Sequence, residues 1–235
     1  MTEIKYLLFD LDGTLLHFNM NEFIDQYLSM IIKHFTDVRE PQQIPAWILQ
    51  GTELMLKNNG ERLNSEIFLE FFSARSGLPE ALVWQRFLNF YQTDFATLIA
   101  LTRSVTAARA VLEAAVAKGY RLVLATQPVF PLLAIRQRLQ WAGLDDLPFE
   151  LITHIENMHA CKPSRSYFEE ILKILQIQAE QCLMVGNELQ TDMASKQAGI
   201  KSFYLSDQAQ NIHCTAVDYA GSLTDLAKQL DLHSG

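Results

Sequence analysis

Two acidic residues interrupt an apolar run near the start of the chain, in the stretch YLLFDLDGTLL that covers residues 6–16. The segment from Tyr6 to Phe9 predicts a strand buried on both faces, as the central strand of a parallel sheet is. Because side chains alternate along an extended chain, Asp10 and Asp12 are expected to point into the same small space. Two carboxylates that close repel each other, and either a divalent cation or a retained proton relieves the repulsion. Both arrangements are typical of an active site.

An ordinary strand-to-turn exit is the alternative interpretation, since aspartate and glycine are common in turns. It accounts for Asp12 and Gly13 but leaves Asp10 unexplained, because Asp10 directly follows Phe9 and is expected at the buried edge. Gly13 permits backbone torsions that other residues avoid, and Thr14 adds a hydroxyl and a free amide at the turn. We therefore interpret residues 10–14 as functional.

The stretch FDLDGTL, residues 9–15, resembles the DxDGT first motif of the haloacid dehalogenase superfamily of phosphatases and phosphotransferases. The resemblance implies an α/β core with a Rossmann-like parallel sheet flanked by helices. It also implies that Asp10 attacks phosphorus, that Asp12 handles the proton and that Mg²⁺ is the cofactor. Gly13 and Thr14 are then expected to contact the substrate.

Composition limits the partners of the chain. A formal net charge of −8 over 235 residues argues against nucleic acid, whose phosphates would be repelled, but is compatible with a small phosphorylated metabolite bound beside a metal. Hydrophobic residues at 49% and charged residues at 20% fit a globular protein. No stretch has the apolar length of a membrane span, and residues 1–5 lack the features of a signal peptide. We therefore expect a cytoplasmic protein with no membrane partner.

The three cysteines, Cys161, Cys182 and Cys214, are widely spaced and form no C-x-x-C pair. We expect them to be reduced and mostly buried. Cys161 precedes a lysine discussed below, so a reactive role is the alternative to packing.

From residue 17 to residue 97 the spacing of apolar residues becomes helical, and four helices are predicted. An insertion just after Thr14 would stand over the carboxyl ends of the strands, where open α/β sheets bind ligands. It resembles the helical cap that superfamily members insert between their first and second motifs. The predicted division is therefore a core of residues 1–16 and 98–235 with an all-helical cap of residues 17–97. His17, near the hinge, is a candidate substrate contact, although a linker role is the alternative.

Two further motifs follow in the expected order. Residues 121–125 predict a buried strand that ends at Thr126, which resembles the second motif, a Ser or Thr that holds a phosphoryl oxygen. Gln127 follows, where family members often carry Asn, and we place it among the substrate contacts. Lys162 and Pro163 precede a predicted helix and resemble the third motif, whose lysine steadies the charge of nucleophile and phosphate. Alone, each would read as a turn former or a surface lysine.

The fourth motif departs from the family pattern. A predicted strand, residues 181–185, is followed by Gly186 and then Asn187, where family members usually carry an aspartate that binds magnesium. An amide oxygen lacks the charge of a carboxylate and should bind Mg²⁺ more weakly. Glu188 is a possible substitute ligand. Asp192 fits the second acid of the motif, although it would also complement the dipole of the helix that it precedes.

These observations predict a magnesium-dependent phosphatase that works through an aspartyl-phosphate intermediate on Asp10. Two alternatives stay open: a phosphomutase of the same superfamily, and a binding or regulatory protein with weakened catalysis. A dehalogenase is disfavoured, since dehalogenases lack the second aspartate and need no metal. The predicted catalytic residues are Asp10, Asp12, Thr126 and Lys162, and the predicted metal ligands are Asp10, Asp12 through its carbonyl, Asn187, Glu188 and Asp192.

Overall fold

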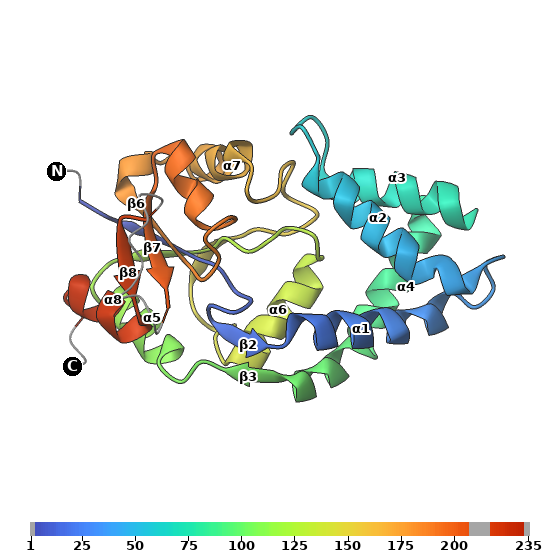
Figure 1. Cartoon of the computed structure of the whole chain (residues 1–235), viewed down its shortest axis with the longest axis horizontal. Helices are drawn as coiled ribbons and strands as arrows, with labels where there is room; N and C mark the ends of the chain where they lie inside the picture. Colours follow the sequence, from blue (N-terminus) through green and yellow to red (C-terminus); the bar gives the residue numbers. More distant parts are fainter. Residues whose placement is uncertain (1–2, 207–216, 233–235) are drawn as a thin grey trace.

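A six-stranded parallel sheet lies at the centre of the protein, with strand order β5-β4-β1-β6-β7-β8. It is seen in a computed structural model that describes residues 3–206 and 217–232 (Figure 1). The strands are β1 (Tyr6–Phe9), β4 (Arg121–Leu124), β5 (Phe149–Ile152), β6 (Cys182–Gly186), β7 (Lys201–Leu205) and β8 (Tyr219–Gly221). The α/β class with a parallel sheet, predicted from the sequence, is confirmed.

Alternate residues of β1 enter two different cores, which is why the strand reads as a continuous apolar run. Leu7 and Phe9 pack on one face of the sheet, and Tyr6 and Leu8 pack on the other. The first face is covered by α5 (Ala108–Ala117), α6 (Leu132–Ala142) and α8 (Leu223–Gln229), and the second by α7 (Arg165–Leu175).

The central position of β1 brings three strand ends together. Phe9 is in register with Leu124 of β4 on one side and with Val185 of β6 on the other. The backbone of Asp10 continues this pattern, donating from its amide to the carbonyl of Val185 over 3.0 Å. Residues that follow β1, β4 and β6 therefore meet at the carboxyl edge of the sheet.

Four helices form a bundle beside the sheet, on the right of Figure 1. They are α1 (Met20–Ile31), α2 (Ile44–Leu56), α3 (Asn64–Ser76) and α4 (Glu80–Gln92), and they enclose their own largely aromatic core. Short 3-10 segments complete the helical structure: Ile32–Phe35, Pro41–Gln43, Phe95–Leu101, Ala179–Gln181 and Met193–Ala198. The four-helix insertion is as the sequence predicts, while the boundaries 17 and 97 stay a prediction.

Asn64, the first residue of α3, holds the bundle against the core. Its side chain is fully buried, and its amide nitrogen donates to the carbonyls of Pro128 and Ala160 over 3.2 and 3.4 Å. Its backbone amide donates to the carbonyl of Met158. Since these partners follow β4 and β5, the bundle sits against the carboxyl edge of the sheet.

A short antiparallel ribbon joins the two chain crossings between bundle and core. β2 (Leu16–Phe18) pairs with β3 (Thr102–Ser104), and His17 lies opposite Arg103. The sequence did not predict this ribbon, because three-residue strands are too short to show a period. It also did not predict β8, and the helix expected after Asp192 is a 3-10 segment.

Cys161 and Cys182 are free and buried, as predicted, and Cys214 lies outside the described residues. Burial raises the pKa of each of the two thiols to about 12, which favours packing over reactivity. Among the described residues, no helix is both long and apolar enough to cross a membrane.

Candidate active site

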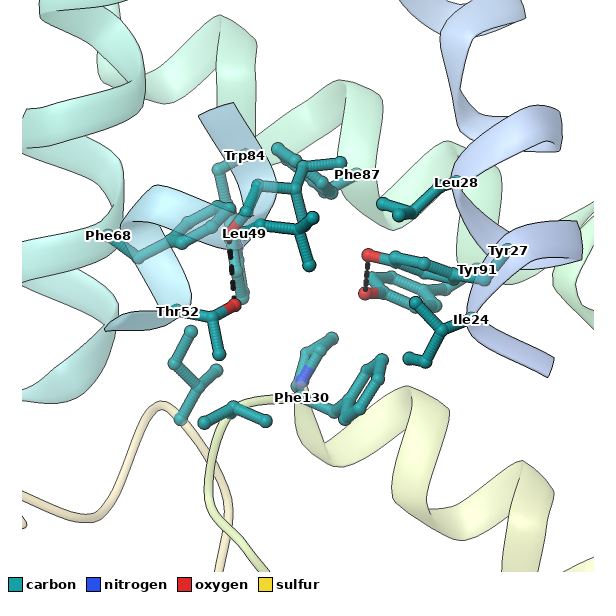
Figure 2. Close-up of a pocket in the computed structure, with 14 residues that line it drawn as sticks. Ile24, Tyr27, Leu28, Leu49, Thr52, Phe68, Trp84, Phe87, Tyr91 and Phe130 are labelled. Atoms are coloured by element: carbon teal, nitrogen blue, oxygen red, sulfur yellow. Dashed lines mark hydrogen bonds between the residues drawn. The ribbon is translucent and has the colours of Figure 1, made fainter. Parts of the chain in front are cut away.

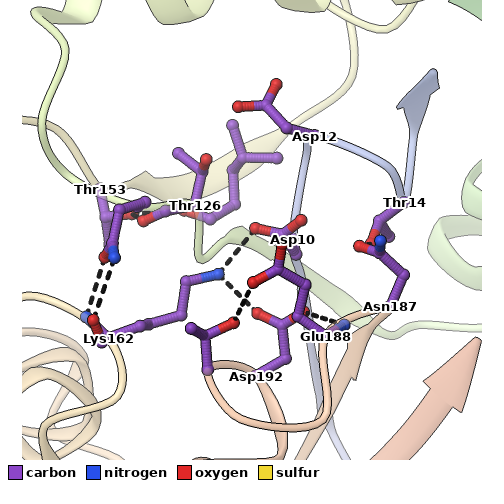
Figure 3. Close-up of polar contacts among 12 residues, drawn as sticks. Asp10, Asp12, Thr14, Thr126, Thr153, Lys162, Asn187, Glu188 and Asp192 are labelled. Carbon is purple, nitrogen blue, oxygen red and sulfur yellow. Dashed lines mark hydrogen bonds and ion pairs between the residues drawn. The ribbon is translucent and has the colours of Figure 1, made fainter. Parts of the chain in front are cut away.

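A lysine lies between two carboxylates at the carboxyl edge of the sheet (Figure 3). The ammonium nitrogen of Lys162 donates to Oδ1 of Asp10 over 2.7 Å and to Oδ1 of Asp192 over 2.6 Å. The three residues are only 1 to 6% exposed. When both acids are ionised, the single positive charge of Lys162 leaves one negative charge uncompensated. Because the cluster is buried, water does not screen that charge. The cluster is therefore poised to accept a further cation or a proton.

Burial, the largest effect on Asp10, raises its pKa to about 7. Lys162 lowers the pKa, while the neighbouring carboxylates of Asp192 and Asp12 raise it further. For Lys162, burial disfavours the charged form, but Asp10 and Asp192 outweigh it and raise its pKa. Lys162 therefore stays protonated, whereas the ionisation of Asp10 depends on burial and on the charges of Lys162, Asp192 and Asp12.

Gln127 fixes the backbone that carries this lysine. Its Oε1 accepts from the amide of Lys162 over 2.9 Å, and its Nε2 donates to the carbonyl of Lys162 over 3.0 Å. Both ends of the side-chain amide are engaged, so the structure gives Gln127 a bracing role. A contact between Gln127 and substrate stays a prediction.

Asp192 is held by a close approach of backbone to side chain. Its Oδ2 accepts from the amide of Glu188 over 3.0 Å, and a Cβ atom on Gly186 would collide with this same oxygen. Only glycine at position 186 therefore allows Asp192 to reach Lys162 in this geometry.

Asn187 lies on the other side of Asp10, against the turn that follows β1. The buried hydroxyl of Thr14 donates to its Oδ1 over 2.9 Å. Gly13 has a positive φ of 82°, and a Cβ atom there would lie 2.5 Å from Nδ2 of Asn187. The first and fourth predicted motifs are thus in direct contact.

Asp12 points away from the lysine cluster, as Figure 3 shows. Its Oδ2 accepts from Nη1 of Arg138, on α6, over 2.5 Å. The sequence interpretation did not include Arg138. The signal was available, because Arg138 lies four residues after Ala134 and four before Ala142, on the buried stripe of its helix.

The remaining predicted residues differ in position. Thr126 is buried after β4, and its carbonyl accepts from Thr153 and Tyr167, each over 2.8 Å. His17 is exposed on β2 and borders a pocket of about 230 Å³ together with Gly13 and Thr14. The structure thus places His17 beside the turn after β1, not beside Lys162.

The oxygen donors around Asp10 suit a hard cation. Mg²⁺ commonly takes one or two carboxylates and completes its shell with water and substrate phosphate. Asp10 supplies a carboxylate and Asn187 an amide oxygen, and the single cation of Lys162 lies between two acids. Glu188 is exposed, and its carboxylate accepts from the hydroxyl of Thr191 over 2.8 Å. Within residues 3–206 and 217–232, no three His, Cys, Asp or Glu side chains converge as a metal cluster. The donors present fit Mg²⁺ only as a site shared with substrate and water.

An apolar cavity of about 100 Å³ lies between the helical bundle and the loop that follows β4 (Figure 2). Tyr27 and Tyr91 are among its lining residues, and their hydroxyls are hydrogen-bonded over 2.9 Å. Phe130 borders the cavity and also covers the guanidinium of Arg138, with 4.6 Å from Cζ to the ring centre. Neither Asp10 nor Lys162 lines it. Phe130 therefore connects the cavity with the ion pair of Arg138 and Asp12.

A family model and a curated relative both match most of the chain. A family model described as haloacid dehalogenase-like hydrolase matches residues 4–199. The chain is 27% identical over 208 residues to a phosphoglycolate phosphatase of Colwellia psychrerythraea, covering 88% of this chain and 86% of the relative.

Two solved structures share the fold. A HAD phosphatase from Thermococcus onnurineus has a TM-score of 0.60 and 20% identity, covering 99% of this chain and 100% of that one. A 2-haloacid dehalogenase from Pseudomonas syringae pv. Tomato has a TM-score of 0.63 and 18% identity, covering 97% and 98%.

Proposed function

Because the chain belongs to the haloacid dehalogenase-like hydrolase family, we propose that it is a magnesium-dependent phosphatase of a small phosphate monoester. The observation that carries the proposal is the buried cluster of Asp10, Lys162 and Asp192 at the carboxyl edge of the sheet. Similarity to a phosphoglycolate phosphatase supports phosphate-ester hydrolysis rather than another reaction of the family. A phosphomutase and a catalytically weakened binding protein are the alternatives.

Asp10 is the proposed nucleophile. One of its carboxylate oxygens forms a bond to phosphorus while the bond from phosphorus to the ester oxygen breaks, which leaves an aspartyl phosphate. Asp12 gives a proton to the departing oxygen and later takes one from the water that attacks the aspartyl phosphate. That second attack releases inorganic phosphate and restores Asp10.

Lys162 offsets the negative charge that Asp10 and the phosphoryl group bring together in a site with little water. Its two hydrogen bonds to acids keep its ammonium group beside the nucleophile. Thr126 follows the neighbouring strand β4 and is the proposed contact for a phosphoryl oxygen.

Asp10, the carbonyl of Asp12 and Asn187 are the proposed holders of Mg²⁺. Asp192 is a weaker candidate, because its two oxygens already accept from Lys162 and Glu188. When bound, Mg²⁺ would supply the positive charge that the cluster lacks and would reduce the repulsion between Asp10 and a phosphate. With an amide at position 187, we expect millimolar rather than micromolar metal to be needed for full activity.

The first experiment measures hydrolysis of 4-nitrophenyl phosphate and a panel of phosphorylated metabolites, with Mg²⁺ and with EDTA. Wild-type protein should release phosphate only with metal, and Asp10→Asn should lose at least about 10³-fold in kcat. Asp25→Asn, an equal change of charge on the exposed side of α1, is the matched control. Wild-type turnover in purified Asp10→Asn would refute the mechanism. Conversion of a sugar phosphate to its isomer without phosphate release would favour the mutase.

A further inference from the structure

Arg138 is a buried arginine whose one ion-pair partner among the described residues is Asp12. The arginine side chain is 1% exposed and the Asp12 side chain 17%. A guanidinium removed from water loses its hydration, and a single carboxylate in good geometry returns part of that free energy. The pair joins α6 to the turn after β1 across 126 positions of sequence.

Other arginines of the chain are paired differently. Arg109 forms a two-pronged contact with Asp146 and also donates to the carbonyl of Gly143, and its side chain is 45% exposed. Arg86 contacts both oxygens of Asp37 and is 19% exposed. Such pairs are typical of surfaces, where water completes the hydrogen bonding. Arg138 shares neither the exposure nor the full set of partners.

Several polar atoms around this pair have no hydrogen-bond partner among the described residues. They are Nε and Nη2 of Arg138 and Oδ1 of Asp12. Phe130 covers the guanidinium and contributes a cation–π contact, but a ring does not satisfy in-plane N–H groups. Buried polar atoms left unpaired cost stability, and a fold retains them mainly where function needs them. The arrangement therefore points to a task for Arg138 beyond holding α6 in place.

The position in which Arg138 holds the Asp12 carboxylate indicates what this task is. In an in-line displacement the attacking and leaving oxygens lie on opposite sides of phosphorus. A group that exchanges a proton with the leaving oxygen must therefore stand beyond the phosphoryl group, on the side opposite Asp10. The Asp12 carboxylate is turned away from the lysine cluster (Figure 3), and its Oδ2 accepts from Nη1 of Arg138.

We propose that Arg138 is a positioning residue, which fixes the Asp12 carboxylate on the leaving-group side of the site. This proposal rests on the proposed phosphatase function. Arg138 acts through Asp12, since its guanidinium is buried, is covered by Phe130 and forms its ion pair with Asp12.

A double-mutant cycle tests the proposal, using Arg138→Met and Asp12→Asn alone and together. The substrates are 4-nitrophenyl phosphate, whose leaving group departs without a proton, and phenyl phosphate, whose leaving group needs one. Arg138→Met should lower kcat/KM for phenyl phosphate by roughly 10²-fold and for 4-nitrophenyl phosphate by less than about 10-fold. It should lower neither value further in the Asp12→Asn background.

Two variants separate positioning from structural damage. Arg138→Lys retains one charged donor and should recover part of the loss on phenyl phosphate. Arg136→Met removes an exposed arginine of the same helix and should leave both substrates unaffected. Equal losses on both substrates, or a loss in Asp12→Asn as large as in wild type, would overturn the proposal. If Arg138→Met does not fold, the same criteria apply to Arg138→Lys.

Thermal unfolding of the four proteins of the cycle, in EDTA, provides a readout that needs no activity. Arg138→Met should lower Tm by roughly 10 °C in wild type and by much less in Asp12→Asn, where the ion pair is already lost. If the shifts in Tm are non-additive but the protein has no phosphatase activity, the proposed function is refuted and the ion pair between Arg138 and Asp12 is supported. Additive shifts in Tm would refute the pair even in an active enzyme.

Discussion

Replacing Asp10 by asparagine should change how the stability of the protein depends on pH. In the folded state burial raises the pKa of Asp10 from 3.8 to about 7, so folding takes up a proton between these values. The stability that protonated Asp10 contributes is complete below pH 4 and is lost as the pH rises through 7. The full difference corresponds to about 4 kcal/mol, of which about 3 kcal/mol falls between pH 5 and pH 8. Asparagine does not titrate, so the variant should lack this loss.

Urea unfolding at pH 5, 6, 7 and 8 in EDTA measures the effect as the difference in unfolding free energy between wild type and Asp10→Asn. The difference should move by about 3 kcal/mol in favour of the variant as the pH rises. Asp25→Asn, which changes an exposed carboxylate, should follow wild type. Parallel curves for wild type and Asp10→Asn would refute the reasoning about the buried cluster.

Magnesium gives the same experiment a second arm. A cation that binds the ionised form of Asp10 adds stability by mass action, about 2.7 kcal/mol at a concentration 100 times Kd. Magnesium should therefore raise the stability of wild type at pH 7 and pH 8, which flattens its decline between pH 5 and pH 7, and leave Asp10→Asn unchanged. Equal stabilisation of both proteins would place the cation away from Asp10.

Three further changes probe other parts of the site. Lys162→Met leaves two buried carboxylates without their cation. We expect kcat, measured by phosphate release, to fall by more than about 100-fold, and the free energy of unfolding, measured in urea, to fall by roughly 3–5 kcal/mol. Asn187→Asp should tighten magnesium binding by about 10-fold in calorimetry, and unchanged affinity would exclude position 187 as a ligand. Gly13→Ala should cost roughly 2 kcal/mol more in urea unfolding than Gly143→Ala, because both glycines have positive φ but only a Cβ at 13 meets another side chain; equal costs would show that the contact with Asn187 is unimportant.

The sequence predicts the parallel sheet, and one geometric rule predicts where residues of the site meet. Parallel strands end at the same edge, so residues that follow separate buried strands meet there. This rule accounts for Asp10, whereas Lys162 and Asp192 were predicted from their resemblance to the third and fourth motifs. The three residues lie 30 to 182 positions apart in the sequence and share two hydrogen bonds. The apolar runs of β1, β4 and β6 were long enough to locate those edges.

Features that depend on partners distant in sequence were not predictable in the same way. Nothing around Asp12 indicates which cation it will meet, and Arg138 shows only that a charged residue occupies the buried stripe of a helix. The hydrogen bonds from the side chain of Gln127 to the backbone of Lys162 were likewise not predictable, because the two residues are 35 positions apart, and the contact between Gln127 and substrate stays a prediction. The β2–β3 ribbon requires pairing across the whole insertion, which three-residue segments do not reveal.

Asn64 gives the helical bundle a direct hold on the loops that carry the chemistry. Its side-chain nitrogen donates to the carbonyl of Pro128, which directly follows Gln127, and to the carbonyl of Ala160, two residues before Lys162. Lifting α3 from the sheet would break both bonds at once, in a place that water does not reach. A movement of α3 is therefore coupled to a movement of the segments that carry Gln127 and Lys162.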